Sequence, residues 1–173
     1  MGLFDKLKEK SRGILTAAEP ERDVPPAPED EVRARLAAIS GLGIETGTDD
    51  GDVVVAWSAR IDSAFVDGAE HEYLYRAIRV SLDPDKHVAH GLCLKRDTDA
   101  EASFLTGGLS LSKGWERGQF TGTEKVRVLA WLGPHRTEGG ATDAGYTFGW
   151  ADLRAPVMDA VTGAGWTYKP KTV

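Results

Sequence analysis

The chain has 173 residues, of which 41% are hydrophobic, and a formal net charge of −6. This hydrophobic fraction excludes a wholly disordered chain and suffices for the core of one domain. The acidic excess, with no basic stripe in the body of the sequence, argues against general nucleic-acid binding.

Cys93 is the only cysteine, so an intrachain disulfide is excluded. It stands between Leu92 and Leu94, and this apolar setting predicts an inert core thiol in a reducing, cytoplasmic compartment. No apolar run approaches the length of a membrane-spanning helix.

Residues 1–18 are predicted to form a short amphipathic helix, because their apolar residues recur at helical spacing opposite a charged side. Four basic and two acidic residues give this segment a net charge of +2. A helix this short is unstable alone in water, so we expect it to lie on another surface. The predicted contact residues are Leu3, Phe4, Leu7, Ile14 and Leu15, with Lys6, Lys8, Lys10 and Arg12.

Three surfaces suit such a helix. It can bind an anionic membrane, with its basic residues facing the lipid headgroups and its apolar residues inserted. Its low net charge would make it a weak anchor, and several copies in an oligomer would bind more strongly. It can dock in a groove on a partner protein or a neighbouring subunit. It can also fold back on its own domain, and the sequence leaves the three open.

Residues 19–30 are predicted to be an acidic, proline-rich linker. Pro20, Pro25, Pro26 and Pro28 fix the backbone torsion φ and remove amide donors, which favours an extended, semi-stiff spacer. The predicted domain boundary follows it.

Residues 31–173 are expected to form one α+β domain. A helix over 29–40 precedes strands over 53–61, 72–82 and 87–95, which turn signals join into an antiparallel meander. Further strands are predicted over 103–111, 115–120, 125–132 and 146–150, and a helix over 152–162 with Asp152 as its N-cap precedes a short strand over 166–168. The predicted fold is a single, mostly antiparallel sheet of six or seven strands with both helices on one face.

No catalytic, metal or cofactor motif is present. His87 and His90 would point to opposite faces of one strand, and neither a His-Glu-x-x-His nor a Cys-x-x-Cys pattern occurs. The sequence also lacks a Gly-x-Ser-x-Gly elbow. We therefore expect no metal, no cofactor and no assignable catalytic residue.

Aromatic residues concentrate in the predicted strands, and Tyr146, Phe148 and Trp150 alternate so that they share one face. Together with Trp57 they would either fill the core or line an apolar ligand pocket on the sheet.

The expected function is that of a non-catalytic intracellular binding or adaptor module, which residues 1–18 target to a protein partner or to the inner face of a membrane. Two alternatives remain open. One is a carrier or enzyme that holds a small apolar ligand on the aromatic face, and the other is a structural subunit, including a homo-oligomer.

Overall fold

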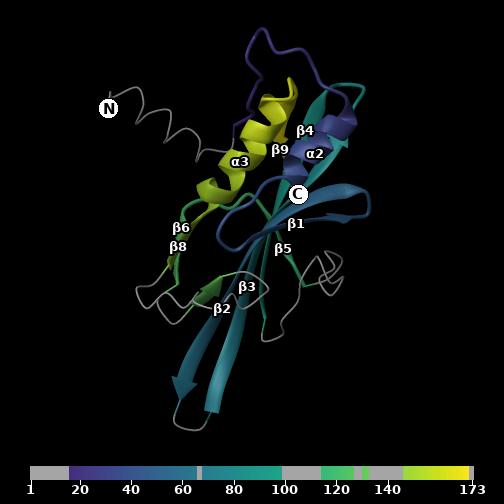
Figure 1. The fold of residues 1–173 in the computed structure, drawn as a ribbon. Coiled ribbons are helices and arrows are strands. Elements are labelled where there is room, and N and C mark those ends of the chain that lie inside the picture. Colours follow the sequence, from purple (N-terminus) through teal and green to yellow (C-terminus); the bar gives the residue numbers. More distant parts are fainter. Residues whose placement is uncertain (1–15, 66–67, 99–113, 127–129, 133–145, 172–173) are drawn as a thin grey trace, which may run out of the picture.

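The computed structural model describes residues 16–65, 68–98, 114–126, 130–132 and 146–171. The predicted amphipathic helix over 1–18 lies outside them up to Leu15, and its last three residues are not helical, since Ala18 forms a β-bridge with Tyr168. The predicted strand over 103–111 also lies outside the described residues. Figure 1 shows the elements, which in chain order are α2 (Glu29–Ala37), β1 (Ile44–Asp49), β2 (Asp52–Phe65), β3 (Gly68–Asp83), β4 (Val88–Thr98), β5 (Glu116–Gly118), β6 (Thr123–Val126), β7 (Ala130–Leu132), β8 (Tyr146–Gly149), α3 (Trp150–Thr162) and β9 (Thr167–Pro170). No helix in the described ranges is long and apolar enough to cross a bilayer.

The fold is α+β with a seven-stranded, mostly antiparallel sheet, as predicted. Strands β2, β3 and β4 form its centre as an antiparallel meander. β1 and β7 pair with successive parts of the outer edge of β2, while β9 and β5 do the same along β4. The β4–β9 pair is parallel, and β6 and β8 form a separate two-stranded ribbon.

The main core lies between the sheet and the two helices, which Figure 1 shows on the same face. Alternate residues of β2, from Val53 to Ala59, point into this core, as the two-residue strand period requires. α2 buries Val32 and Leu36 against them, and α3 buries Leu153, Val157 and Val161. This helical spacing of four residues places each apolar stripe toward the sheet.

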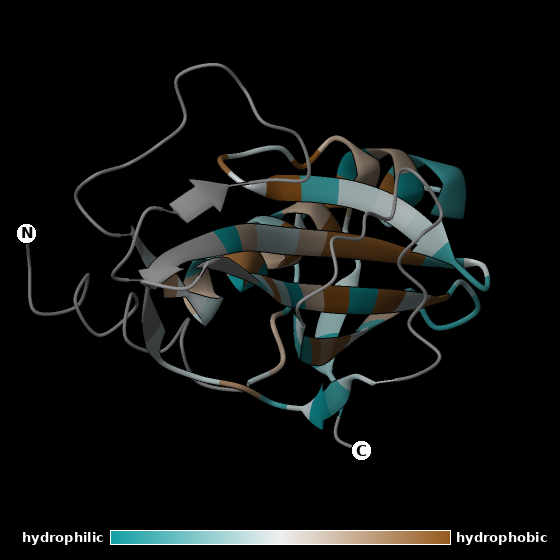
Figure 2. Ribbon diagram, turned by 90° about the horizontal axis from the view of Figure 1, so that it is seen from below, coloured by the Kyte–Doolittle hydropathy of each residue, from teal (hydrophilic) through white to brown (hydrophobic). Residues whose placement is uncertain are grey.

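The opposite face of the sheet is also buried in its centre. Val54, Ala56 and Ala77 are fully buried there and Leu94 nearly so, with Leu92 and Trp115 packed against them. Figure 2 shows hydrophobic segments along the central strands and hydrophilic turns at one end of the sheet. The sequence correctly placed both helices on one face but did not predict this second cluster.

Two of the predicted elements differ from the expectation in their boundaries or partners. The predicted strand over 125–132 contributes to two sheets, because Thr123–Val126 pairs with β8 whereas Ala130–Leu132 pairs with β2. α3 begins at Trp150, and Asp152 lies in its first turn, where its carboxylate accepts a hydrogen bond of 3.1 Å from the Gly149 amide. This arrangement satisfies an orphan amide at the helix start from inside the first turn rather than from the N-cap position.

Candidate functional site

The structure shows where the predicted contact segment meets the body, although its nine predicted residues, Leu3, Phe4, Lys6, Leu7, Lys8, Lys10, Arg12, Ile14 and Leu15, lie outside the described part of the chain. The described chain starts at Thr16, which is exposed like Ala17. Ala18 then pairs with Tyr168 of β9 through two backbone hydrogen bonds of 2.8 Å. The segment therefore joins the body at a defined point beside β9.

Residues 18–28, which we call the strap, are fastened to the body. The Ala27 amide donates to the Ala164 carbonyl at 2.9 Å, and the Trp166 indole Nε1 donates to the Ala27 carbonyl at 2.8 Å. Near the other end, Thr167 Oγ1 donates to the Glu19 carboxylate at 2.6 Å. The strap makes one turn, where the Val24 amide donates to the Glu21 carbonyl at 3.1 Å. The contacts near its two ends attach it to β9 and to the turn that precedes β9.

The sequence predicted an extended segment here but did not predict its attachment. The missed signal is Trp166, a large aromatic residue directly after a glycine-rich helix end. Its side chain is only 1% exposed and its indole nitrogen needs a hydrogen-bond partner when buried, which the strap carbonyl supplies.

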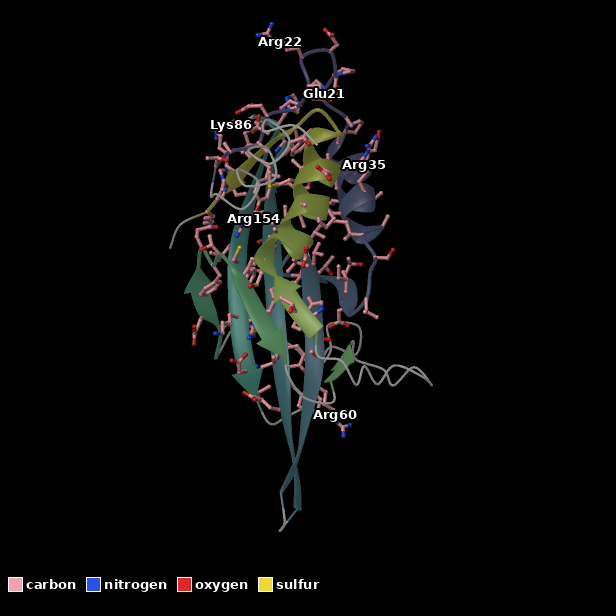
Figure 3. The ribbon with its side chains drawn as sticks, turned by 90° about the vertical axis from the view of Figure 1, so that its left-hand side faces the viewer. Glu21, Arg22, Arg35, Arg60, Lys86 and Arg154 are labelled. Carbon is pink, nitrogen blue, oxygen red and sulfur yellow. The ribbon has the colours of Figure 1, made fainter. Side chains whose placement is uncertain are left out.

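A groove of about 480 Å³ lies between the strap and the last turns of α3. Its apolar surface comes from Ala18, Val24 and Met158. Three carboxylates, of Glu19, Glu21 and Asp159, also line it. Figure 3 shows Glu21 and Arg22 at the far end of the molecule from the β2–β3 hairpin tip. The groove is thus an acidic and partly apolar surface, and it lies next to the point where the chain leaves the C-terminal end of the basic segment.

The predicted aromatic set is largely brought together, but as packed rings. Trp57 stacks on Phe148 with ring centroids 4.5 Å apart, and Phe148 meets Trp150 edge-to-face at 5.5 Å. All three are at most 2% exposed, and Phe120 covers the other side of Trp150 at 5.1 Å. The Tyr146 backbone pairs with Val126, and its side chain lies outside the described residues.

A buried polar cluster lies under α3. Arg154 is 1% exposed, and its Nη2 donates to the Phe120 carbonyl at 2.8 Å and contacts Cys93 Sγ at 3.5 Å. Within the described residues, its Nε and Nη1 have no hydrogen-bond partner, and neither does the Tyr168 hydroxyl. Figure 3 shows Arg154 pointing from α3 toward the sheet beside a sulfur atom. Burial disfavours the charged phenolate and raises the pKa of Tyr168, and the neighbouring Arg154 guanidinium, which acts in the opposite direction, only partly offsets this.

The position of Arg154 in α3 is a sequence signal for this cluster, and the sequence-based prediction did not use it. Arg154 occupies the buried stripe of α3 together with Trp150, Val157 and Val161. An arginine within an apolar helical stripe marks a buried cation. Cys93 beside it is a buried free thiol, as predicted.

The outer face of the sheet carries a smaller cavity of about 250 Å³. Leu92 and Leu94 form its floor, and Arg79, Arg117 and Lys171 contribute positive charges. Arg79 is already neutralised, since it pairs with Asp52 at 2.6 Å and Asp49 at 3.3 Å. Arg79 therefore adds no net positive charge that would attract an anion to this cavity.

No group of three or more histidine, cysteine or carboxylate side chains in the described ranges could hold a metal ion. His87 lies in the turn before β4, with φ of +51°, rather than on the strand as predicted.

Comparisons of the chain with protein-family models, with curated proteins and with solved structures gave no match. Function is therefore inferred from the surfaces and cavities of the chain itself.

Proposed function

We propose that the protein is a non-catalytic binding or adaptor module whose N-terminal amphipathic segment, residues 1–15, contacts a partner protein while the α+β body serves as its rigid base. One observation carries this proposal. The strap fixes the chain directly after the C-terminal end of the segment, at Ala18, beside β9 and the C-terminal part of α3.

The fixed attachment supports a docking role for physical reasons. A fifteen-residue amphipathic segment gains little from its own helix propensity and depends on a surface that covers its apolar side. Because the strap is bound to the body, only Thr16 and Ala17 separate the segment from a rigid scaffold. A short connection limits the positions that the segment samples and so lowers the ordering cost of binding.

The charges near the attachment point favour a protein surface over an anionic membrane. Residues 19–31 carry six acidic side chains and one basic side chain, a net charge of −5, next to a segment of net charge +2. Within a Debye length of about 8 Å, those carboxylates would repel anionic lipid headgroups. A protein groove that receives Leu3, Phe4 and Leu7 does not meet this repulsion.

The second expectation, an apolar ligand on the aromatic face, gains no support from the described cavities. Trp57, Phe148 and Trp150 pack against one another, and none of them lines the grooves described above.

The test compares the full chain with two variants. One lacks residues 1–15, and the other carries Leu3→Ser, Phe4→Ser and Leu7→Ser. The truncation stops at residue 15 because the strap belongs to the body. A photo-crosslinking amino acid at position 8 reports protein partners, and sedimentation with phosphatidylcholine–phosphatidylserine vesicles reports lipid binding.

We expect one defined cross-linked partner for the full chain and its loss in the serine variant, with no sedimentation in either case. Sedimentation that the serine substitutions abolish would identify a membrane as the surface instead. Cross-linking by the serine variant identical to that of the full chain, together with equal sedimentation of the full chain and both variants, would refute a docking role for the segment.

A further inference from the structure

β1 is an edge strand with a partner on one side only. Its residues Ile44–Asp49 pair with β2, and no strand in the described ranges pairs with its other side. Edge strands expose unpaired amide and carbonyl groups and can template the addition of another strand. β1 has six residues and contains neither lysine nor proline, two residue types that commonly block such pairing.

The hairpin geometry shows which backbone groups of β1 point outward. Asp50 and Gly51 both have positive φ, 50° and 83°, and form a two-residue turn between Asp49 and Asp52. In such a hairpin Asp49 and Asp52 form a hydrogen-bonded pair, and hydrogen bonding then alternates along the ladder. The Ser58 amide donates to the Gly43 carbonyl at 3.0 Å, which agrees with this alternation because Gly43 is six residues before Asp49. Gly47 and Glu45 therefore bond to β2, whereas Thr46 and Thr48 direct their amide and carbonyl groups away from it.

A groove of about 290 Å³ runs beside this outward edge, between β1 and α2. Arg33, Ala34 and Ala37 form its helical wall, and Thr46, Gly47, Thr48 and Val53 form the opposite wall. The Arg33 guanidinium pairs with Glu29 at 2.6 Å. Two hydrogen bonds across the groove hold its walls together and fix their spacing. Arg33 Nη1 donates to the Gly51 carbonyl at 2.7 Å, and Thr46 Oγ1 donates to the Ala37 carbonyl at 3.0 Å.

The short alanine side chains leave room where a strand added to β1 would place its side chains. Thr46 and Thr48 lie on the helix-facing side of β1, because they oppose the core residues Val55 and Val53. Residues of an incoming strand opposite these threonines would point to the same side, into the groove. The groove therefore matches alternate apolar side chains of an extended peptide.

The charged residues at the end of β1 indicate which side chains the peptide would carry on its other face. Asp49, Asp50 and Asp52 surround Arg79, and the Asp50 side chain is 93% exposed. Three carboxylates around one guanidinium leave a net negative tip that attracts basic side chains. The same charges oppose a second copy of the chain, since the antiparallel register that uses Thr46 and Thr48 of both copies would place Glu45 opposite Asp49.

We propose that β1 and the α2–β1 groove bind an extended segment of a partner protein by antiparallel strand addition, with alternate apolar side chains in the groove and basic side chains on the other face. This binding surface is separate from residues 1–15 and does not depend on their function.

The test uses three synthetic hexapeptides titrated into the full chain while NMR follows its amide signals. The first alternates arginine and valine. The second carries N-methyl groups on the valines, whose amides would face β1, and the third carries them on the arginines, whose amides would face away. We expect the first and third peptides to shift the signals of Thr46, Gly47, Thr48, Ala34 and Ala37, and the second to leave them unmoved.

Two pairs of variants locate the site. Thr48→Pro removes an outward amide without removing a bond to β2 and should weaken binding about tenfold, whereas Thr48→Val should stay within about twofold. Ala34→Leu fills the groove and should also abolish the shifts, whereas Ala38→Leu, on an exposed residue that does not line it, should not.

Shifts that persist with the valine-methylated peptide would overturn strand addition. Absence of any shift with the arginine–valine peptide at millimolar concentration would overturn the proposal as a whole. If a peptide that alternates glutamate and valine bound equally well, the charge assignment would be wrong. None of these results bears on residues 1–15, so the two proposals can fail separately.

Discussion

The ring of Tyr168 lies directly over Gly91, so closely that a Cβ atom at Gly91 would be 2.6 Å from the ring atoms Cε2 and Cζ. Gly91 and Tyr168 come from the parallel strands β4 and β9, and Tyr168 is fully buried. The absence of a side chain at Gly91 therefore allows the last strand to pack onto the sheet.

Gly91→Ala should lower the free energy of unfolding by about 2–3 kcal/mol, because the buried ring must move to admit the methyl group. Urea denaturation measures this change. Gly118→Ala is the control, since its nearest heavy atom would be 4.0 Å away and its cost should stay below about 1 kcal/mol. Equal losses for the two variants would show that the contact with Tyr168 does not limit position 91.

Tyr168 should make stability depend on alkaline pH. Burial raises the pKa of its phenol above the ordinary value of 10.0, so the folded protein keeps a proton that the unfolded chain releases. The contribution of protonated Tyr168 to the free energy of unfolding is complete below about pH 10, and it is lost as the pH rises from there toward the pKa of Tyr168 in the folded protein. Denaturation of the wild type and of Tyr168→Phe at several pH values above 9 measures the difference.

The Tyr168→Phe variant should lose less stability with rising pH than the wild type. At neutral pH its free energy of unfolding should equal or slightly exceed that of the wild type, because the hydroxyl that it removes has no hydrogen-bond partner among the described residues. Parallel stability curves above pH 9 would contradict a raised pKa at this residue.

Arg154 is a buried cation with two unpaired donor nitrogens and no carboxylate within ion-pair distance in the described residues. Arg154→Met keeps most of the side-chain volume and removes the desolvated charge, so it should raise the free energy of unfolding by about 1 kcal/mol. Arg35→Met is the control, because Arg35 is exposed and its pair with Glu31 should contribute at most about 0.5 kcal/mol. A loss above about 2 kcal/mol for Arg154→Met would show that its bond to Phe120 outweighs the cost of burial.

The strap should contribute to stability through Trp166. Trp166→Phe removes the donor to the Ala27 carbonyl and should cost about 1–3 kcal/mol. Trypsin should also cleave faster after the exposed Arg22, since a loosened strap fits a protease more readily. The control is Thr167→Val, which removes an exposed bond to Glu19 and should change stability by less than about 0.5 kcal/mol. Unchanged cleavage in Trp166→Phe would show that Trp166 does not hold the strap.

Local patterns predicted most of the fold because its elements follow simple periods. The alternation from Val53 to Ala59 and the helical spacing of Leu153, Val157 and Val161 each depend on neighbours in sequence. Turn signals between β2, β3 and β4 then led to the meander. The error over residues 125–132 arose because continuous β propensity says nothing about which strand will be the partner.

The candidate sites were much less accessible to sequence reasoning, because they depend on contacts between distant residues. Ala27 and Trp166 are separated by 139 residues, and Cys93 and Arg154 by 61. The groove beside β1 likewise requires α2 and the β1–β2 turn to be held together by Arg33.

The sequence alone determined the α+β class, the meander and the buried thiol, because each follows from residue type and short-range spacing, and it predicts an amphipathic helix over residues 1–18, of which residues 1–15 lie outside the described chain. Only the tertiary structure decided that the proline-rich stretch is bound to the body, that the aromatic rings stack on one another and that β1 is left as an open edge. Those outcomes depend on which surfaces meet after the chain has folded, and no local period encodes that choice.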